Sequence, residues 1–247
     1  MNPQAYLDMA ETESSHWWFL GRRTLIAAMI KKLKLPPHAQ ILEVGCGTGG
    51  NLTMLSNFGD VYGLEMDPTA LAIAAEKTHN RFDIRAGCCP HDIPFQNQRF
   101  DLICLFDVLE HIADDNATLL ALKPLLSETG RIVITVPAYP WLYSTHDSFL
   151  HHKRRYLASP LGKQCVALGF KVVKLSYFNT ILFPLAVAAR FKDKWLGNPT
   201  STGTATPPKA INKLLLAIFA AERWVLAHGN LPYGVSLLCI LKANDGS

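Results

Sequence analysis

The residues best suited to bind a charged ligand lie in one short stretch, residues 41–50, where an apolar run leads into a glycine-rich turn. Gly45, Gly47 and Gly50 follow the spacing Gly-x-Gly-x-x-Gly, which is typical of dinucleotide-binding turns. Glycines let backbone N–H groups approach a ligand, and the N-terminus of the helix predicted from residue 51 adds partial positive charge. Strand, turn and helix together predict a corner that binds an anion or a nucleotide.

Acidic residues flank this turn at the ends of predicted strands. Glu43 lies two residues before the first glycine, where it would face the ligand crevice. Glu65 ends a second strand and follows Gly45 by twenty residues, so its carboxylate could accept both hydroxyls of a ribose. A third polar segment, residues 107–112 with the sequence Asp-Val-Leu-Glu-His-Ile, follows the strand predicted over residues 100–106.

These three motifs together resemble the class I methyltransferases that depend on S-adenosylmethionine (SAM). The resemblance covers about residues 38–137 and is specific, because three separated motifs occur in the right order. It implies SAM as the cofactor and S-adenosylhomocysteine as the product. It also implies an α/β fold with a Rossmann-like, seven-stranded, mostly parallel sheet, whose last strand is antiparallel and lies beside the fifth. We expect an N-terminal helical lid over residues 1–37 and a methyltransferase domain over residues 38–247, with a helical insertion over about residues 177–232.

The resemblance also implies which residues contact the cofactor. The glycines would approach the methionine part, and Glu65 would hold the ribose. Cys89 stands where the family has an adenine-contacting Asp, so Asp92 or a backbone carbonyl is the alternative partner of the adenine. The full set of expected cofactor residues is Trp17, Arg22, Arg23, Glu43, Gly45, Cys46, Gly47, Gly49, Glu65, Met66, Cys89, Asp92, Phe106, Asp107 and His111.

Candidate catalytic residues gather after the fourth and fifth predicted strands. The loop over residues 143–156 resembles a bacterial subgroup with a His-Asp…Gly-His-x-Arg-Arg-Tyr signature, in which His151 here replaces the glycine. Histidine can act as a general base near neutral pH, and paired arginines such as Arg154 and Arg155 can clamp a carboxylate or phosphate. The alternatives are a solvated basic loop and, for His111, a helix cap. The expected catalytic residues are His111, His146, His152 and Tyr156, with no metal.

Alternating strand and helix patterns must position these residues. Strands are expected near residues 40–45, 60–65, 82–86, 100–106 and 131–136, and helices near residues 49–57, 68–79 and 115–127. Such alternation predicts a parallel sheet covered on both faces, with ligands at the carboxyl ends of the strands. A helix near residues 159–168, a strand near 170–176 and a closing strand near 235–242 complete the prediction.

Two regions lie outside this alternation. Residues 17–19 are three large aromatics beside Arg22, and they form either a buried helix face or a lid over the cofactor. Two apolar helices, near residues 177–190 and 211–227, flank a linker over residues 197–208. They either cap the sheet, form an apolar substrate channel, or contact a membrane surface, where Trp195, Lys192 and Lys194 would be an interfacial anchor.

Composition sets outer limits. A chain of 247 residues with 49% hydrophobic content can form one large α/β domain, and a net charge of +4 does not call for a nucleic-acid partner. The six cysteines include no Cys-x-x-Cys pair, so neither a zinc site nor a disulfide framework is predicted. Reduced thiols and a polar N-terminus favour a cytoplasmic protein. The oligomeric state stays open.

Three functions compete for this sequence. The first is methyl transfer from SAM to a small or lipid-like acceptor with an anionic or polar head. The second is an NAD(P)-dependent oxidoreductase, because the glycine spacing and Glu65 fit that site too. The third is a scaffold without a cofactor. Glu43 and residues 107–112 have no role in an oxidoreductase, so we favour the methyltransferase, with the acceptor and its O, N or C atom left open.

Overall fold

The computed structural model describes residues 3–196 and 206–244, including side chains except those of residues 3–5 and 192–196. Residues 197–205 of the linker expected over residues 197–208 therefore lie outside the described residues. The side chains of Lys192, Lys194 and Trp195, expected at a membrane surface, are also outside them.

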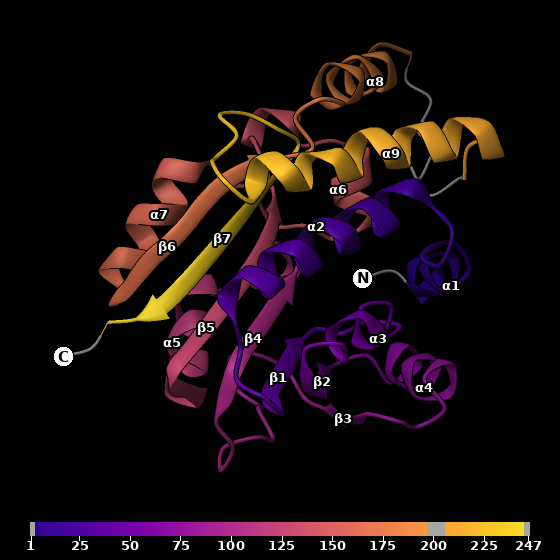
Figure 1. The fold of residues 1–247 in the computed structure, drawn as a ribbon. Coiled ribbons are helices and arrows are strands. Elements are labelled where there is room, and N and C mark those ends of the chain that lie inside the picture. Colours follow the sequence, from indigo (N-terminus) through magenta and orange to yellow (C-terminus); the bar gives the residue numbers. More distant parts are fainter. Residues whose placement is uncertain (1–2, 197–205, 245–247) are drawn as a thin grey trace.

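A seven-stranded sheet with the order β3-β2-β1-β4-β5-β7-β6 forms the centre of the fold (Figure 1). Its strands are β1 (Ala39–Val44), β2 (Gly59–Glu65), β3 (Asp83–Ala86), β4 (Phe100–Phe106), β5 (Leu126–Pro137), β6 (Phe170–Phe178) and β7 (Ser236–Ala243). The pairs among β1 to β5 are parallel, whereas β7 runs antiparallel between β5 and β6. The predicted Rossmann-like, mostly parallel α/β sheet is confirmed.

The strand order places one crevice at the middle of the sheet. From β1 the chain moves outward through β2 and β3, and it then returns to the other side of β1 to form β4. The carboxyl ends of β1 and β4 therefore flank the point where the strand order reverses, which is where open α/β sheets bind ligands. The residues at this edge are the candidates for function.

Helices cover both faces of the sheet (Figure 1). On one face α2 (Trp17–Leu33) and α9 (Lys209–Leu226) lie side by side, and α3 (Leu52–Leu55) packs into the same core. On the other face lie α5 (Asp115–Leu122) and α7 (Ala158–Ala167). Successive strand residues point to opposite faces, so Ile41 joins the first core and Leu42 the second. A parallel sheet buried on both faces requires such continuous apolar runs.

The remaining elements lie outside these two layers or connect the strands. They are α1 (Pro3–Thr12), α4 (Pro68–Lys77), η1 (Leu109–His111), η2 (Lys123–Leu125), η3 (Pro140–Leu142), α6 (Thr145–Phe149) and α8 (Phe183–Leu196). The helix α4 starts as the sequence predicts, because the side chain of Asp67 accepts the N–H groups of Thr69 and Ala70 ahead of the first turn.

The helix expected over residues 177–190 is wrong at its start. Residues through Phe178 continue β6, because they pair with β7 up to Ser236, and α8 begins at Phe183. The connection between them is held by the buried carboxylate of Glu222 in α9, which accepts the N–H groups of residues 179–181 at 2.7–2.8 Å. A tertiary contact of this kind has no local signal in the sequence.

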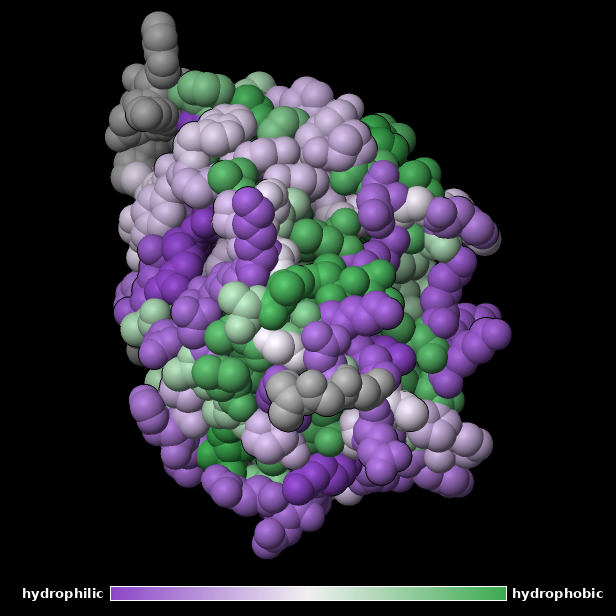
Figure 2. All heavy atoms as spheres, turned by 90° about the vertical axis from the view of Figure 1, so that its left-hand side faces the viewer, coloured by the Kyte–Doolittle hydropathy of each residue, from purple (hydrophilic) through white to green (hydrophobic). Residues whose placement is uncertain are grey.

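The edge strand β6 and α7 lie on the face shown in Figure 2, where hydrophobic and hydrophilic side chains are mixed. Lys171 and Lys174 of β6 place positive charge along this open edge, which opposes pairing with another strand. Within the described part of the chain, no helix has the length and apolar character that a membrane span requires.

Candidate functional site

The glycine-rich turn follows β1 and depends on left-handed backbone conformations. Gly45, Gly47 and Gly49 have φ angles of 65°, 55° and 78°. A Cβ at Gly45 would lie 2.8 Å from the side chain of Val108, so this close approach to the segment after β4 requires glycine. At Gly47 the nearest atom to a Cβ would be the methyl group of Met9 at 3.9 Å, so this part of the turn faces α1 and not the core.

Glu65 holds the other side of the turn from the end of β2. Its buried carboxylate accepts N–H groups from Gly47 at 2.8 Å and from Met66 and Asp67 at 2.9 Å. Burial raises the pKa of Glu65, while the N–H bonds to Asp67, Gly47 and Met66 oppose that rise. The acid predicted to hold a ribose therefore lies beside the turn, with its oxygens already engaged by backbone groups.

A second buried carboxylate, Glu43, lies at the end of β1. One oxygen accepts the side-chain amide of Asn51 at 2.7 Å, while the other has no hydrogen-bond partner. Burial raises its pKa to about 8, although Asn51 and the nearby Arg22 lower it. A buried polar atom without a partner carries an energetic cost, so this oxygen is available to a donor on a ligand.

Arg22 is brought from α2 to the end of β4. Its guanidinium forms an ion pair with Asp107 and lies 4.7 Å from the centre of the Trp18 ring. Asp107 itself has a φ angle of 56°, an uncommon conformation for a residue other than glycine. Burial lowers the pKa of Arg22 to about 10. The Nε atom of Arg22 is buried and unpartnered, like the second oxygen of Glu43.

These orphaned atoms and the open turn fit a cofactor with a nucleoside part and a charged amino-acid part. The turn offers backbone, Glu43 and Asp107 offer carboxylates, and Arg22 offers a guanidinium at the same edge of the sheet. Such chemistry suits the ribose, ammonium and carboxylate groups of SAM.

Three residues of the N-terminal segment also reach this turn, and the sequence analysis missed them. The buried carboxylate of Glu13 accepts the hydroxyl of Thr48 at 2.7 Å and pairs with Lys77. Burial, with Glu65 and Asp67 nearby, raises the pKa of Tyr6. Tyr6, Met9 and Glu13 are spaced at i, i+3 and i+7, so helical periodicity could have identified this face.

The remaining predicted cofactor residues are dispersed. Trp17 packs edge-on against Phe219 of α9 at 5.8 Å. The guanidinium of Arg23 donates to the carbonyl of Glu13. Cys46 and Phe106 are buried in the core below the turn, Met66 is 73% exposed, Cys89 is half-buried, and Asp92 is exposed.

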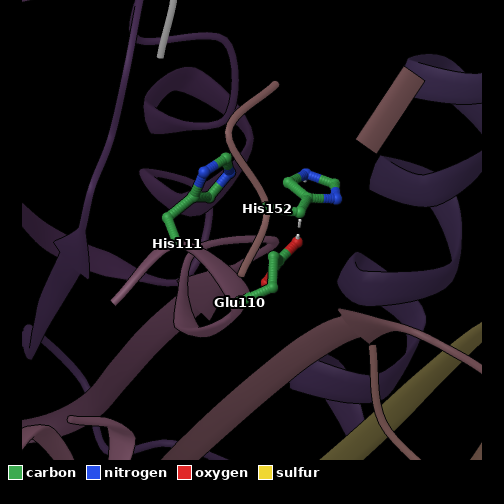
Figure 3. Close-up of side chains that lie close together, drawn as sticks. All are labelled: Glu110, His111 and His152. Atoms are coloured by element: carbon green, nitrogen blue, oxygen red, sulfur yellow. Dashed lines mark ion pairs between the residues drawn. The ribbon is translucent and has the colours of Figure 1, made fainter. Parts of the chain in front are cut away.

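Two histidines and a glutamate form a second group, at η1 and the loop after α6 (Figure 3). Glu110 is fully buried, and neither of its carboxylate oxygens has a hydrogen-bond partner. Oε1 of Glu110 lies 3.9 Å from Nε2 of His152, and the rings of His111 and His152 are 4.6 Å apart. Burial raises the pKa of Glu110 to about 8. Burial and His152 lower the pKa of His111 to about 3, so this imidazole is neutral.

Asp147 organises the loop that carries His152. Its carboxylate lies 2.9 Å from Nδ1 of His152 and receives two N–H bonds from Arg155, at 2.8 and 3.0 Å. Burial opposes ionisation of Asp147, yet the hydrogen bonds from His152 and Arg155 hold its pKa below the ordinary value. Asp147 and Arg155 are buried, so the alternative of a solvated basic loop is wrong for them.

Of the other candidate residues in this loop, two pair with a carboxylate of the chain and one is buried without a partner. Arg154 pairs with Asp115 at 2.9 Å, and the hydroxyl of Tyr156 donates to the same carboxylate at 2.9 Å inside the core. Nδ1 of His146 is buried and unpartnered, and burial with nearby Arg190 lowers the pKa of His146 to about 4.

The comparisons with known proteins agree with this geometry. The profile of a family described as a methyltransferase domain matches residues 19–175, more than half of the chain. An uncharacterized 37.1 kDa protein in transposon TN4556 of Streptomyces fradiae is 25% identical over 257 residues, covering 96% of this chain and 70% of its own. The demethylmenaquinone methyltransferase of Staphylococcus saprophyticus is 25% identical over 189 residues, covering 74% of this chain and 71% of its own.

Among solved structures, a chain from the complex between the Haloferax volcanii Trm112 methyltransferase activator and the putative methyltransferase has the same fold. It aligns with a TM-score of 0.63 and 17% identity, over 98% of this chain and 95% of its own. Fold, family match and the chemistry of the turn agree on SAM as the cofactor. The chain belongs to the methyltransferase domain family and is a class I SAM-dependent methyltransferase.

Proposed function

We propose that this enzyme methylates a small or lipid-like acceptor with a polar or anionic head and a hydrophobic body. The observation that carries the proposal is the junction of a buried polar loop with an exposed apolar surface at the carboxyl edge of the sheet. The polar side is the Asp147–His152 pair, and the apolar side consists of Trp141, Ile181, Leu185 and Phe191, which are 52–60% exposed.

Contacts of two residues of α8 join these sides. Arg190 of α8 donates to the hydroxyl of Ser144 at 2.8 Å, so α8 is tied to the loop that carries Asp147. The ring centre of Phe183 in α8 lies 5.5 Å from that of Tyr139 and 5.8 Å from that of Tyr233. An apolar wall with a few placed polar groups is typical of small-molecule sites.

Bound SAM supplies an electrophilic methyl group on a sulfonium, so the protein must orient the acceptor and, for a hydroxyl, accept its proton. In this proposal Glu65 and the glycine-rich turn hold the cofactor, and Arg22 with Asp107 holds its amino-acid end. His152 accepts the proton, since Asp147 at Nδ1 leaves Nε2 as the basic atom. His111 and His146 are alternative bases, and Tyr156 is the weakest candidate because its hydroxyl donates to Asp115.

The name of the Staphylococcus saprophyticus relative designates a quinone as substrate, and a quinone with an apolar tail has the proposed character. The family match gives no support to the NAD(P)-dependent oxidoreductase alternative. The proposal includes a cytoplasmic enzyme that touches a membrane surface without crossing it, since Leu214 and Trp224 of α9 are also at least 60% exposed.

The experiment is a transfer assay with methyl-labelled SAM against a series of phenolic or quinol head groups, each with and without a long apolar tail. We expect the tailed compounds to react faster. His152→Ala should slow transfer by about 100-fold or more, the usual loss when a general base is removed. The matched control is His79→Asn, since His79 is an exposed histidine after the end of α4 and its φ of 53° tolerates asparagine. Preference for tailless, fully polar acceptors, or wild-type rates in the His152 variant, would overturn the proposal.

A further inference from the structure

The group formed by Glu110, His111 and His152 has a feature that methyl transfer by acid–base chemistry does not explain. Both oxygens of Glu110 are buried without any hydrogen-bond partner, at the end of the strand β4. Arg22 is paired with Asp107, and Arg155 is paired with Asp147, so the neighbouring guanidinium groups are already matched to other carboxylates. Glu110 is therefore a buried acid aimed at two imidazoles, and a metal ion between them would satisfy its unpartnered oxygens.

The spacing of the three side chains fits one ion. Each offers one ligand atom, and these atoms all lie within 4.8 Å of one another. Zinc binds nitrogen and oxygen at about 2.0–2.2 Å, so tetrahedral ligand atoms stand roughly 3.4 Å apart. Oε1 of Glu110 and Nε2 of His152 are separated by 3.9 Å. Closing this pair on an ion needs a side-chain adjustment of about half an ångström, and a pair at the 4.8 Å bound would need about 1.4 Å.

The surroundings orient the ligands as metal sites require. Asp147 lies 2.9 Å from Nδ1 of His152, so Nδ1 carries the proton, and Nε2, which lies 3.9 Å from Oε1 of Glu110, keeps its lone pair for an ion. A carboxylate behind a histidine is the usual partner that fixes the tautomer of a metal ligand. Arg155 holds this carboxylate with two N–H bonds, which makes Asp147 a rigid positioning residue.

We propose that Glu110, His111 and His152 bind a divalent transition-metal ion, with zinc as the best fit to two imidazoles and one carboxylate. Three protein ligands leave a position open, as in catalytic zinc sites. The consequence for catalysis rests on the proposed function: an acceptor oxygen bound at the open position would lose its proton more readily, and His152 would then be a ligand and not the base.

The test measures metal binding without SAM or acceptor, so its outcome does not depend on the proposed function. Full-length protein stripped with a chelator is titrated with Zn²⁺ by calorimetry, and with Co²⁺ by visible absorption. We expect one ion per chain and the intense absorption of four- or five-coordinate Co²⁺. Nitrogen-15 spectra of the histidine side chains should show Zn²⁺-dependent shifts for His111 and His152, a readout that needs no variant.

Variants locate the ion. His111→Ala and His152→Ala should each weaken zinc binding more than Asp147→Asn, because losing an outer partner typically costs about 10–100-fold. The matched control is His151→Asn, since His151 is exposed in the same loop and its φ of 59° tolerates asparagine. The proposal is overturned if stripped wild-type protein binds no stoichiometric zinc. It is also overturned if the His111 and His152 resonances do not move, or if folded ligand variants bind as tightly as the control.

Discussion

Replacing Glu65 by alanine should weaken SAM binding and loosen the glycine-rich turn together. The carboxylate already accepts the N–H groups of Gly47, Met66 and Asp67 at 2.8–2.9 Å. A carboxylate has about four acceptor positions, so roughly one remains for a ribose hydroxyl. A bond to the second hydroxyl requires one of these N–H groups to shift.

The expected magnitudes follow from these bonds. A net hydrogen bond contributes about 0.5–1.5 kcal/mol, and water at the edge of the turn can replace part of each lost acceptor, so the free energy of unfolding should fall by about 2–3 kcal/mol. The lost ribose contact should cost a further 1–3 kcal/mol of binding, roughly a 5- to 150-fold higher Kd for SAM. Glu65→Gln keeps one acceptor oxygen, so its free energy of unfolding and its Kd for SAM should lie between those of the wild type and of Glu65→Ala.

Calorimetric titration with SAM and S-adenosylhomocysteine gives the affinity, and urea unfolding gives the stability. Glu76→Ala is the matched control, because Glu76 is an exposed acid on the neighbouring helix α4. A folded Glu65→Ala protein with the wild-type Kd would refute the assignment of Glu65 to the cofactor. A large loss of SAM affinity in Glu76→Ala would refute the inference that the effect of Glu65 comes from its own contacts with the turn and the ribose.

Three further outcomes are expected. Burial raises the folded-state pKa of Glu43 from 4.5 to about 8, so the folded protein retains a proton that the unfolded chain releases; stability therefore falls as pH rises from 5 to 8. Over this pH range the Glu43→Gln variant should lose up to about 4 kcal/mol less unfolding free energy than the wild type, as measured by urea unfolding. Equal slopes of unfolding free energy against pH in the wild type and the variant would contradict this. Deleting residues 1–14 should leave a cooperative thermal transition but raise the Kd for SAM, because Glu13 and Met9 lie against the glycine-rich turn. Tighter SAM binding by the truncated protein would mean that α1 blocks the site. Arg155→Lys should lower stability by about 1–3 kcal/mol in calorimetric melting, because lysine cannot reproduce the paired bonds to Asp147, and an unchanged Tm would argue against this clamp.

The sequence predicted the strands well where burial on both faces produces a strong local pattern. Residues 39–44 are apolar except for Gln40 and Glu43, residues 100–106 are apolar except for Asp101, and both are central parallel strands. It failed at residues 177–182, where an apolar run looked helical. Pairing with β7 and the carboxylate of Glu222 decide the conformation there, and both partners lie far along the chain.

The sequence likewise predicted only part of the candidate site. Glycine spacing and the acids Glu43 and Glu65 are local features tied to strand ends, so the sequence could place them beside one crevice. The roles of the basic loop could not be predicted, because the sequence does not show that Arg155 is used by Asp147 or that Arg154 is used by Asp115. Arg154 or Arg155 was expected to orient the head group of a substrate, and in the structure both pair with carboxylates of the chain itself.

By itself the sequence determined the α/β sheet, the glycine-rich turn and the family resemblance, because periodicity and short spacing act within a few residues of the chain. The tertiary structure alone decided which polar and charged groups meet. It joined Glu13 to Thr48, Arg22 to Asp107, and Glu110 to His152, across separations of 35, 85 and 42 positions. The physical reason is that a buried ionic group is stabilised by a partner, and packing of distant elements rather than neighbours in the chain supplies that partner.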